Sequence, residues 1–178
     1  MPTLPPDVIE TDRLIMRKPV PEDAPVIFET YVRDPEVTRY LTWSPDQSLE
    51  DTRAFIERTL QTWERKTAYA WAITLKESGA VIGMIDVRIE THANLGYVLA
   101  RPYWNKGYMT ECVRAIADWA LAQEEICRVW AVCDVENAAS ARVLEKAGME
   151  REGILRRWIV LPNRSRTPRD CYCYAIVK

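Results

Sequence analysis

The sequence of 178 residues lacks the short motifs that mark several common classes of enzyme. It contains neither the G-x-G-x-x-G pattern of dinucleotide-binding folds nor the G-K-[ST] ending of a phosphate-binding loop. Its five cysteines are an odd number, and no two of them have C-x-x-C spacing. We therefore expect no metal site, and reduced thiols rather than structural disulfides.

Features of a membrane or secreted protein are also missing. No apolar run approaches the roughly 20 residues that a membrane-spanning helix needs. Met1–Pro6 is rich in proline and has no basic region followed by an apolar stretch, unlike a signal peptide. The formal net charge is only −2, with the two signs interspersed, so no large polyanion-binding surface is expected. We expect a cytoplasmic protein without membrane contact or direct nucleic-acid binding.

The chain is long enough for one folded domain, and we predict a single domain over residues 1–178. Apolar periodicity predicts strands and helices in the order β-α-α-β-β-β-α-β-α-β-β, an α+β fold with one mixed sheet and helices on its faces. The predicted strands are Arg13–Arg17, Tyr69–Leu75, Val81–Glu90, Leu95–Leu99, Arg128–Cys133, Gly153–Leu161 and Cys171–Val177. The predicted helices are Pro21–Asp34, Ser48–Lys66, Thr110–Gln123 and Asn137–Ala147.

Some local patterns refine these elements. Ser48 with Asp51 resembles a capping box at the start of the second helix, and Gly148 is typical of a helix stop. In the hairpin, Ile85 and its alternate neighbours face one way, whereas Asp86 and its neighbours face the other. This alternation predicts a hairpin with one buried face.

The segment Leu99–Glu111 (LARPYWNKGYMTE) is the most informative for chemistry. A strand ends, a short turn with Lys106 and Gly107 follows, and an amphipathic helix begins. The first N–H groups of a helix lack partners within it and carry the positive end of its dipole. The arrangement suits a phosphate or pyrophosphate, although a plain strand–turn–helix corner has the same pattern.

The segment WNKGYMTE (Trp104–Glu111) resembles the acetyl-CoA pyrophosphate loop of GNAT acetyltransferases. Gly107 matches the central glycine, whereas Trp104 stands where Gln or Arg is usual and Met109 where Gly or Ala is usual. NAASARVLEKAGM (Asn137–Met149) is similar to the family's later helix, and LGYVL to the strand before the loop. The segments TDRLIMR and N-x-x-S resemble those of one subgroup in particular, the Rim-type ribosomal-protein N-terminal acetyltransferases.

This resemblance implies a single-domain GNAT fold with a mostly antiparallel mixed sheet, splayed between its fourth and fifth strands and flanked by about four helices. Acetyl-CoA would be the co-substrate, with no metal. Backbone groups of the fourth strand would pair with the pantetheine arm and polarise the thioester carbonyl. The loop amides would hold the pyrophosphate, and Asn137 the arm. The implied acetyl-CoA site comprises Tyr97, Val98, Leu99, Trp104, Asn105, Lys106, Gly107, Tyr108, Met109, Thr110, Asn137, Ser140 and Lys146.

Acetyl transfer needs a neutral amine, an oriented thioester and a proton for the departing thiolate. In many relatives a Tyr seven residues after the Asn supplies that proton, but this chain has Leu144 there. The Rim-type subgroup places a Ser at the position of Ser140, which we therefore predict as the catalytic proton donor. A serine that only satisfies helix-terminal backbone is the alternative.

The base that deprotonates the amine is less defined, because Asn94 stands where relatives often have Glu. Glu90 and His92, the only histidine, are the candidate catalytic residues. Asp134 and Glu136 are further candidates, and a water chain is also compatible with the pattern.

Two segments are candidates for acceptor binding. Trp43 lies in the loop Thr42–Gln47, which forms one wall of the acceptor cleft in the family, and we predict Trp43 and Asp134 as substrate contacts. The loop Pro162–Asp170 is basic, with arginines at positions 164, 166 and 169. It is either a solvated hairpin loop or a dock for an acidic peptide or an RNA-rich particle.

The resemblance predicts acetyl transfer from acetyl-CoA to a primary amine, with the N-terminal α-amine of a protein or peptide as acceptor. One alternative is a small amine such as an aminoglycoside, polyamine or amino acid. An acidic cleft would favour a polycation, whereas apolar walls with a basic rim would favour a protein N-terminus. A non-catalytic acyl-CoA-binding module is a further alternative. Similar proteins are often dimers, so a homodimer is a partner to test.

Overall fold

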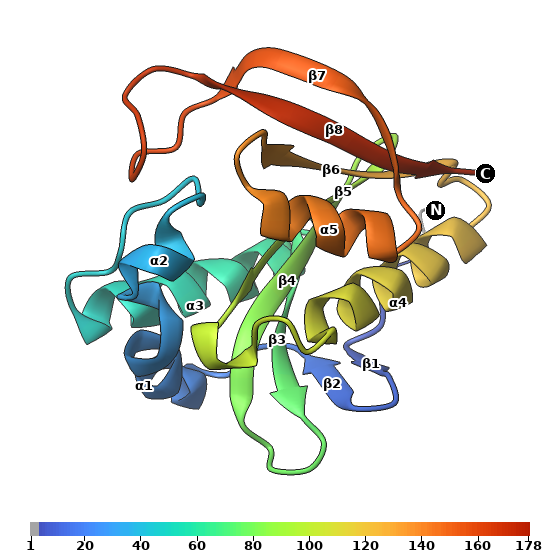
Figure 1. Ribbon diagram of the computed structural model, residues 1–178. Helices are drawn as coiled ribbons and strands as arrows, with labels where there is room; N and C mark the ends of the chain where they lie inside the picture. Colours follow the sequence, from blue (N-terminus) through green and yellow to red (C-terminus); the bar gives the residue numbers. More distant parts are fainter. Residues whose placement is uncertain (1–3) are drawn as a thin grey trace.

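The computed structural model describes residues 4–178. Met1–Thr3, which belong to the predicted domain and to the N-terminal segment that the sequence analysis compared with a signal peptide, lie outside the described residues. One eight-stranded sheet has the order β1-β2-β3-β4-β5-β6-β8-β7 (Figure 1). Of the helices in residues 4–178, none is long and apolar enough to cross a lipid bilayer. The strands are β1 Val8–Glu10, β2 Leu14–Arg17, β3 Tyr69–Leu75, β4 Val81–Ile89, β5 Ala93–Leu99, β6 Arg128–Asp134, β7 Glu150–Ile159 and β8 Arg169–Val177.

The sheet is nearly split between β5 and β6. All other neighbouring strands are antiparallel, but these two are parallel and pair only at Ala93–Val129 and Asn94–Trp130. Beyond Asn94 the pairing stops, although β5 continues to Leu99. The predicted splay is therefore confirmed, and we call the opening beside the second half of β5 the strand gap.

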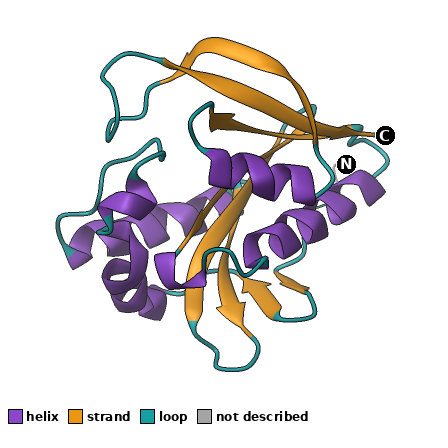
Figure 2. Ribbon diagram, in the orientation of Figure 1, coloured by secondary structure: helices purple, strands orange, loops and turns teal. Residues whose placement is uncertain are grey.

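Helices cover both faces of the sheet (Figure 2). On one face, α4 (Tyr108–Ala122) and α5 (Ala138–Lys146) enclose a cluster with Trp71 and Ile85. On the other, α1 (Ala24–Ile27), α2 (Pro35–Thr38) and α3 (Leu49–Glu64) enclose a second cluster with Ala70 and Met84. We call these the α4–α5 face and the α1–α3 face.

The predicted hairpin with one buried face is wrong in this respect. Alternate residues of β3 and β4 contribute to the two clusters, so both faces of the hairpin are packed. Asp86 lies on the α1–α3 face beside Met84 and is half-buried rather than solvated. Sequence alternation marks a charged residue as exposed, and only the helices packed over this face reveal otherwise.

The predicted helix Pro21–Asp34 is interrupted. It consists of a 3-10 turn (Pro21–Asp23), the short α1 and a π-helical turn (Phe28–Val32). The Thr30 hydroxyl donates to the Val26 carbonyl at 2.5 Å, a bond that competes with the regular backbone pattern. Asp34 then caps α2, a helix that the sequence did not predict.

Several predicted boundaries are confirmed within a few residues. Ser48 and Asp51 form the expected capping box of α3, and Gly148 follows α5 with φ of 95°. β1 was not predicted, because three residues carry too little alternation to register as a strand. With the unpredicted α2, residues 4–178 contain five α-helices, where about four were expected. The five cysteines are free, and only Cys127 is exposed.

Candidate active site

The strand gap exposes backbone groups of β5. Ala100 N–H donates to the Ile82 carbonyl at 2.8 Å, so the alternation of the ladder directs Val98 toward β4. By the same alternation, Tyr97 and Leu99 direct their backbone groups into the gap, where β6 provides no partner. Of the predicted trio, Tyr97 and Leu99 can therefore pair with an extended ligand. The Val98 backbone faces β4, which corrects its predicted role.

The turn before α4 presents free N–H groups. Gly107 caps the helix with φ of 78°, a left-handed conformation that favours glycine. Arg13 Nη1 donates to the Lys106 carbonyl at 2.9 Å and so anchors the carbonyl side of the turn. The N–H groups of residues 108–110 have no hydrogen-bond partner in the described chain. These groups, with the helix dipole, fit the pyrophosphate of acetyl-CoA.

Side chains of this turn mainly support its shape. The Trp104 indole N–H donates to the Leu99 carbonyl at 2.7 Å and fastens the turn to the end of β5. Met109 is buried in the α4–α5 cluster and so contributes only its backbone. Asn105 has a left-handed backbone conformation, with φ of 61°. The Arg13 guanidinium carbon lies 4.5 Å from the centre of the Tyr108 ring. Thr110 is half-buried in the first turn of α4, beside the hollow described next.

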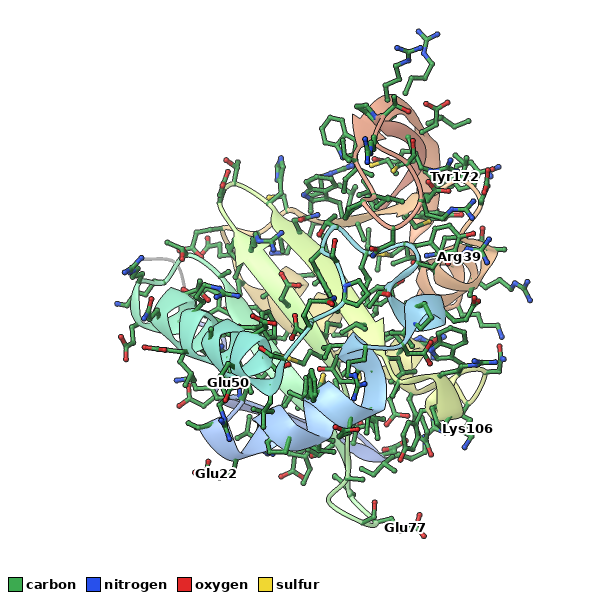
Figure 3. The ribbon with its side chains drawn as sticks, turned by 90° about the vertical axis from the view of Figure 1, so that its left-hand side faces the viewer. Glu22, Arg39, Glu50, Glu77, Lys106 and Tyr172 are labelled. Carbon is green, nitrogen blue, oxygen red and sulfur yellow. The ribbon has the colours of Figure 1, made fainter. Side chains whose placement is uncertain are left out.

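A hollow of about 580 Å³ lies beside the turn, and both basic and acidic side chains line it, the acidic ones being Asp12, Glu111 and Asp118. Arg13, Arg114 and Lys146 line it, and an Arg114 Nη donates to the Lys146 carbonyl. Lys106 extends from the neighbouring turn into solvent (Figure 3). Arg13 is paired with Glu111 at 2.7 Å, whereas Lys106, Arg114 and Lys146 form no ion pair within residues 4–178 and can take phosphate charge of acetyl-CoA. Arg13 and Arg114 were not predicted, because no spacing in the sequence links them to the loop.

Ser140 and Tyr97 meet across the α4–α5 face. Their hydroxyl oxygens are 2.7 Å apart, and either can be the donor. Burial raises the pKa of the Tyr97 hydroxyl, which therefore stays protonated and can donate to Ser140. Ser140 then keeps its own proton for a group in the strand gap. The hydroxyl of Tyr97 was missed by the sequence analysis, which used only its backbone.

Asn137 begins α5. Its Oδ1 accepts the Ser140 N–H at 3.2 Å, so it is the N-cap of this helix. Its Nδ2 has no hydrogen-bond partner within residues 4–178, and its donation to a pantetheine carbonyl stays a prediction.

A half-buried carboxylate beside the gap was not predicted as a site residue. Asp86 stands opposite Gly96 in the β4–β5 ladder, and its Oδ1 would lie 2.7 Å from a Cβ placed on Gly96. Its Oδ2 is buried without a hydrogen-bond partner among the described residues. Burial raises the pKa of Asp86 to about 6, although Arg88 at 3.4 Å opposes this shift.

Glu90 and His92 lie exposed in the turn between β4 and β5, at the opposite end of β5 from Leu99. The four steps from Ala93 to Tyr97 span about 13 Å along an extended strand. The structure therefore does not bring these two candidates together with Ser140, and as bases they stay predictions.

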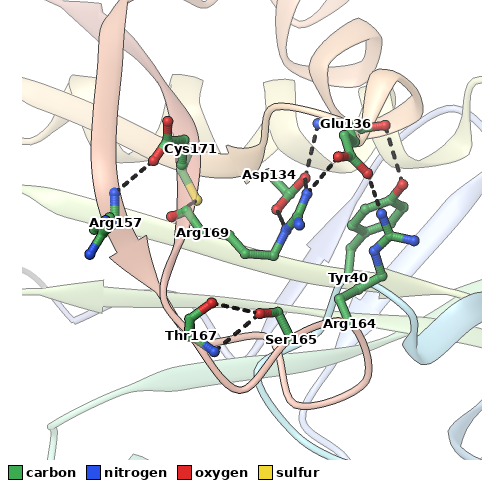
Figure 4. A network of polar contacts seen from close by, with 10 residues as sticks. Tyr40, Asp134, Glu136, Arg157, Arg164, Ser165, Thr167, Arg169 and Cys171 are labelled. Carbon is green, nitrogen blue, oxygen red and sulfur yellow. Dashed lines mark hydrogen bonds and ion pairs between the residues drawn. The ribbon is translucent and has the colours of Figure 1, made fainter.

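Asp134 belongs to a network of ion pairs at the end of β6 (Figure 4). Its fully buried side chain accepts from Arg169 Nε at 2.5 Å and from the Glu136 N–H at 2.9 Å. Burial raises the pKa of Asp134, but these bonds outweigh burial and hold the pKa below its usual value. Both oxygens are used within the protein, so neither is left unpaired for the predicted substrate contact.

The loop between β7 and β8 is tied to the segment that carries Trp43. Asn163 Nδ2 donates to the carbonyls of Thr38 at 2.7 Å and of Trp43 at 2.8 Å. Arg164 forms an ion pair with Glu136. Trp43 is half-buried against the α1–α3 cluster, and its contact with the acceptor stays a prediction. The predicted basic loop is thus partly neutralised, since Arg164 and Arg169 are both paired.

Known proteins are similar to this chain in sequence and in fold. Residues 13–150 match the acetyltransferase (GNAT) domain family. The chain is 30% identical over 175 residues to the uncharacterized N-acetyltransferase YoaA of Bacillus subtilis (strain 168), covering 96% of this chain and 97% of YoaA.

Two solved structures extend this comparison. The microcin C7 self-immunity acetyltransferase MccE, in complex with acetyl-CoA and AMP, has a TM-score of 0.87 at 21% identity, covering 98% of each chain. RimL, a ribosomal L7/L12 alpha-N-protein acetyltransferase in complex with CoA, has a TM-score of 0.82 at 22% identity, covering 96% of this chain and 97% of RimL. The chain belongs to the GNAT family and is an acetyl-CoA-dependent N-acetyltransferase.

Proposed function

We propose that the acceptor is the N-terminal α-amine of a protein or peptide with acidic residues close behind it. The observation that carries this proposal is an apolar wall beside a basic rim on the acceptor side. Trp43 forms the wall, and the loop tied to it by Asn163 carries the rim. RimL, which shares the fold, is named for action on a protein N-terminus.

The rim keeps cations that the protein does not neutralise. Arg166 lies in the loop, and Arg156 and Arg157 lie on the end of β7 that leads into it; all three are exposed, and none forms an ion pair within residues 4–178. A peptide with acidic side chains would gain attraction here, whereas a polyamine or an aminoglycoside would be repelled. The charge of the rim therefore favours an acidic peptide over a polycationic small molecule.

The chain's own groups account for the rest of the reaction. The free N–H groups of Tyr97 and Leu99 would orient the acetyl-CoA arm, and a backbone donor there would polarise the thioester carbonyl. Ser140 would give its proton to the departing thiolate, while the Tyr97 hydroxyl donates to Ser140 Oγ at 2.7 Å. Because a thiolate is a fairly stable leaving group, this proton contributes modestly to the rate.

Thiol release from acetyl-CoA against a panel of amines tests the proposal. The panel contains Ser- and Ala-initiated peptides whose third to sixth residues are acidic, neutral or basic, together with an aminoglycoside and a polyamine. We expect kcat/KM for acidic peptides to exceed that for basic ones by about 10-fold or more at low salt. Arg166→Glu should remove most of this preference, whereas Arg58→Glu on α3 serves as the matched control.

Two results would contradict the proposal. Turnover of the aminoglycoside or the polyamine above every peptide would assign a small amine as the acceptor. Equal rates for acidic and basic peptides would remove the role of the rim.

A further inference from the structure

We propose that Asp86 receives the acceptor's ammonium group and takes its proton, on the face of the sheet opposite Ser140. This inference rests on the proposed amine acetylation and adds the residue that activates the amine. The sequence did not indicate this role for Asp86, and the predicted bases Glu90 and His92 lie elsewhere.

The two faces of the sheet separate the two halves of the reaction. Tyr97 and Ser140 meet on the α4–α5 face, and the turn before α4 adjoins it. A thioester whose sulfur lies near Ser140 would present its carbonyl carbon to the strand gap. The bulk of the bound CoA arm would fill the α4–α5 side, so an attacking amine would approach the carbonyl carbon from the α1–α3 face. Asp86 lies on that approach face, since it alternates with Ile85 and Val87 of the α4–α5 cluster.

Asp86 is also directed toward the gap. Gly96, directly across the ladder, belongs to the strand that lines the gap and precedes Tyr97. The short distance of 2.7 Å between Asp86 Oδ1 and a Cβ placed on Gly96 shows that the carboxylate lies over this glycine. On the other side, β3 places the small Ala70 opposite Asp86. Two minimal side chains thus flank the carboxylate.

The carboxylate lacks the partners that a structural role would require. Among residues 4–178 it accepts no hydrogen bond, and its buried Oδ2 has only Arg88 nearby, at 3.4 Å and without hydrogen-bond geometry. Leaving a buried carboxylate oxygen without a hydrogen bond costs free energy, and the ion pair with Arg88 at 3.4 Å supplies none, so a ligand that donates to Oδ2 would satisfy it. By contrast, the buried Asp23 is fully paired with Arg17 at 2.7 Å.

The proposed step balances in atoms and charge. The acceptor ammonium donates one proton to Asp86, which leaves a neutral amine and a carboxylic acid. The nitrogen lone pair forms the C–N bond, the C–S bond breaks, and its electron pair goes to the CoA sulfur. A second proton leaves the nitrogen and reaches the sulfur, directly or through Ser140. Asp86 then returns its proton to water.

The surroundings of Asp86 define the expected pH dependence. Arg88 on β4 is the charged neighbour, and the facing residues Ala70 and Gly96 carry no titratable group. Burial raises the pKa of Asp86 to about 6. A base acts only when ionised, so kcat/KM should rise with pH through this value.

The test compares Asp86→Asn with wild type and with Glu77→Gln, a matched carboxylate-to-amide control in the exposed β3–β4 turn. With the amine of the panel that is acetylated fastest, we expect Asp86→Asn to lower kcat/KM by about 100-fold or more. The rise of kcat/KM with pH near pH 6 should also disappear. Asp86→Glu should restore part of the rate. Acetyl-CoA affinity should stay within about twofold, which shows that the fold is intact.

A second measurement does not depend on the acceptor's identity. In the CoA complex, the ¹³C signal of the Asp86 carboxyl group should titrate near pH 6 and shift when ethylammonium is added. If peptides are not acetylated but this shift persists, the peptide assignment fails and the amine site stands. The inference is overturned if Asp86→Asn keeps its rate and pH profile, if Glu90→Gln carries the loss instead, or if ethylammonium leaves the Asp86 signal unchanged.

Discussion

Replacing Gly96 with alanine offers a sensitive test of how the carboxylate of Asp86 is positioned. An added Cβ would lie 2.7 Å from Asp86 Oδ1, whereas ordinary van der Waals contact begins at 3.4 Å. The carboxylate must therefore move by about 0.7 Å, because the three atoms nearest to the added Cβ all belong to the Asp86 side chain. Displacing a reacting group by about 1 Å can cost about 100-fold in rate. We expect Gly96→Ala to lower kcat about 10- to 100-fold.

The assay is thiol release at saturating acetyl-CoA, with the melting temperature recorded for each variant. Gly153→Ala on β7 is the matched control, since a Cβ there has no neighbour within 4 Å. Neither glycine has a positive φ, so alanine introduces no backbone strain at either position. Both variants should melt within a few degrees of wild type, and only Gly96→Ala should lose activity.

A double-mutant cycle decides whether the loss passes through Asp86. If it does, Gly96→Ala should cost little more in the Asp86→Asn background, where the base is already absent. An equal loss in both backgrounds would refute the reasoning. It would indicate that the extra methyl group blocks the substrate path or disturbs β5 itself.

Three further predictions concern other parts of the site. Ser140→Ala should lower kcat about 10-fold and Tyr97→Phe somewhat less, and thiol-release assays should show non-additive losses because the hydroxyls are 2.7 Å apart. Asp134→Asn should lower the free energy of unfolding by about 2–4 kcal/mol at pH 7, since Arg169 keeps only Glu136. Because folding lowers the pKa of Asp134, this difference should persist above the unfolded value of about 3.9 and disappear as pH falls through the folded pKa, which urea unfolding at pH 7 and pH 3 checks. Gly107→Ala should weaken acetyl-CoA binding about 10-fold by calorimetry, because a side chain at φ of 78° costs about 1–2 kcal/mol.

Local sequence patterns predicted most of the elements because each pattern has a local physical cause. The strand Tyr69–Leu75 agrees residue for residue, and the cap at Ser48 follows from one side chain and one backbone group. Such features need no knowledge of the rest of the chain. The same reasoning did not predict the interruption of the helix after Pro21. A π-helical turn accompanied by a hydrogen bond from the Thr30 hydroxyl interrupts it, and the spacing of apolar residues does not indicate such a turn.

The candidate site was predictable only where a contiguous motif carries it. The turn around Gly107 and the helix from Asn137 are such motifs, and the helices that follow them begin close to where the sequence predicts, at Tyr108 and Ala138. Asp86 could not be found in this way, because its environment depends on strand pairing and on distant helices. Asp134 illustrates the reverse error, since its partner Arg169 lies 35 positions away and neutralises a carboxylate that seemed free in sequence.

The two residue pairs between β5 and β6 mean that the sheet is almost two separate half-sheets. A pantetheine arm hydrogen-bonded to the backbone of Tyr97 and Leu99 would bridge the two half-sheets, so bound acetyl-CoA would stabilise the fold. At a concentration of 100 times Kd, such binding adds about 2.7 kcal/mol to the free energy of unfolding. The lifetime of this enzyme against proteolysis would then follow the supply of acetyl-CoA, and starvation for it would remove the catalyst along with its substrate.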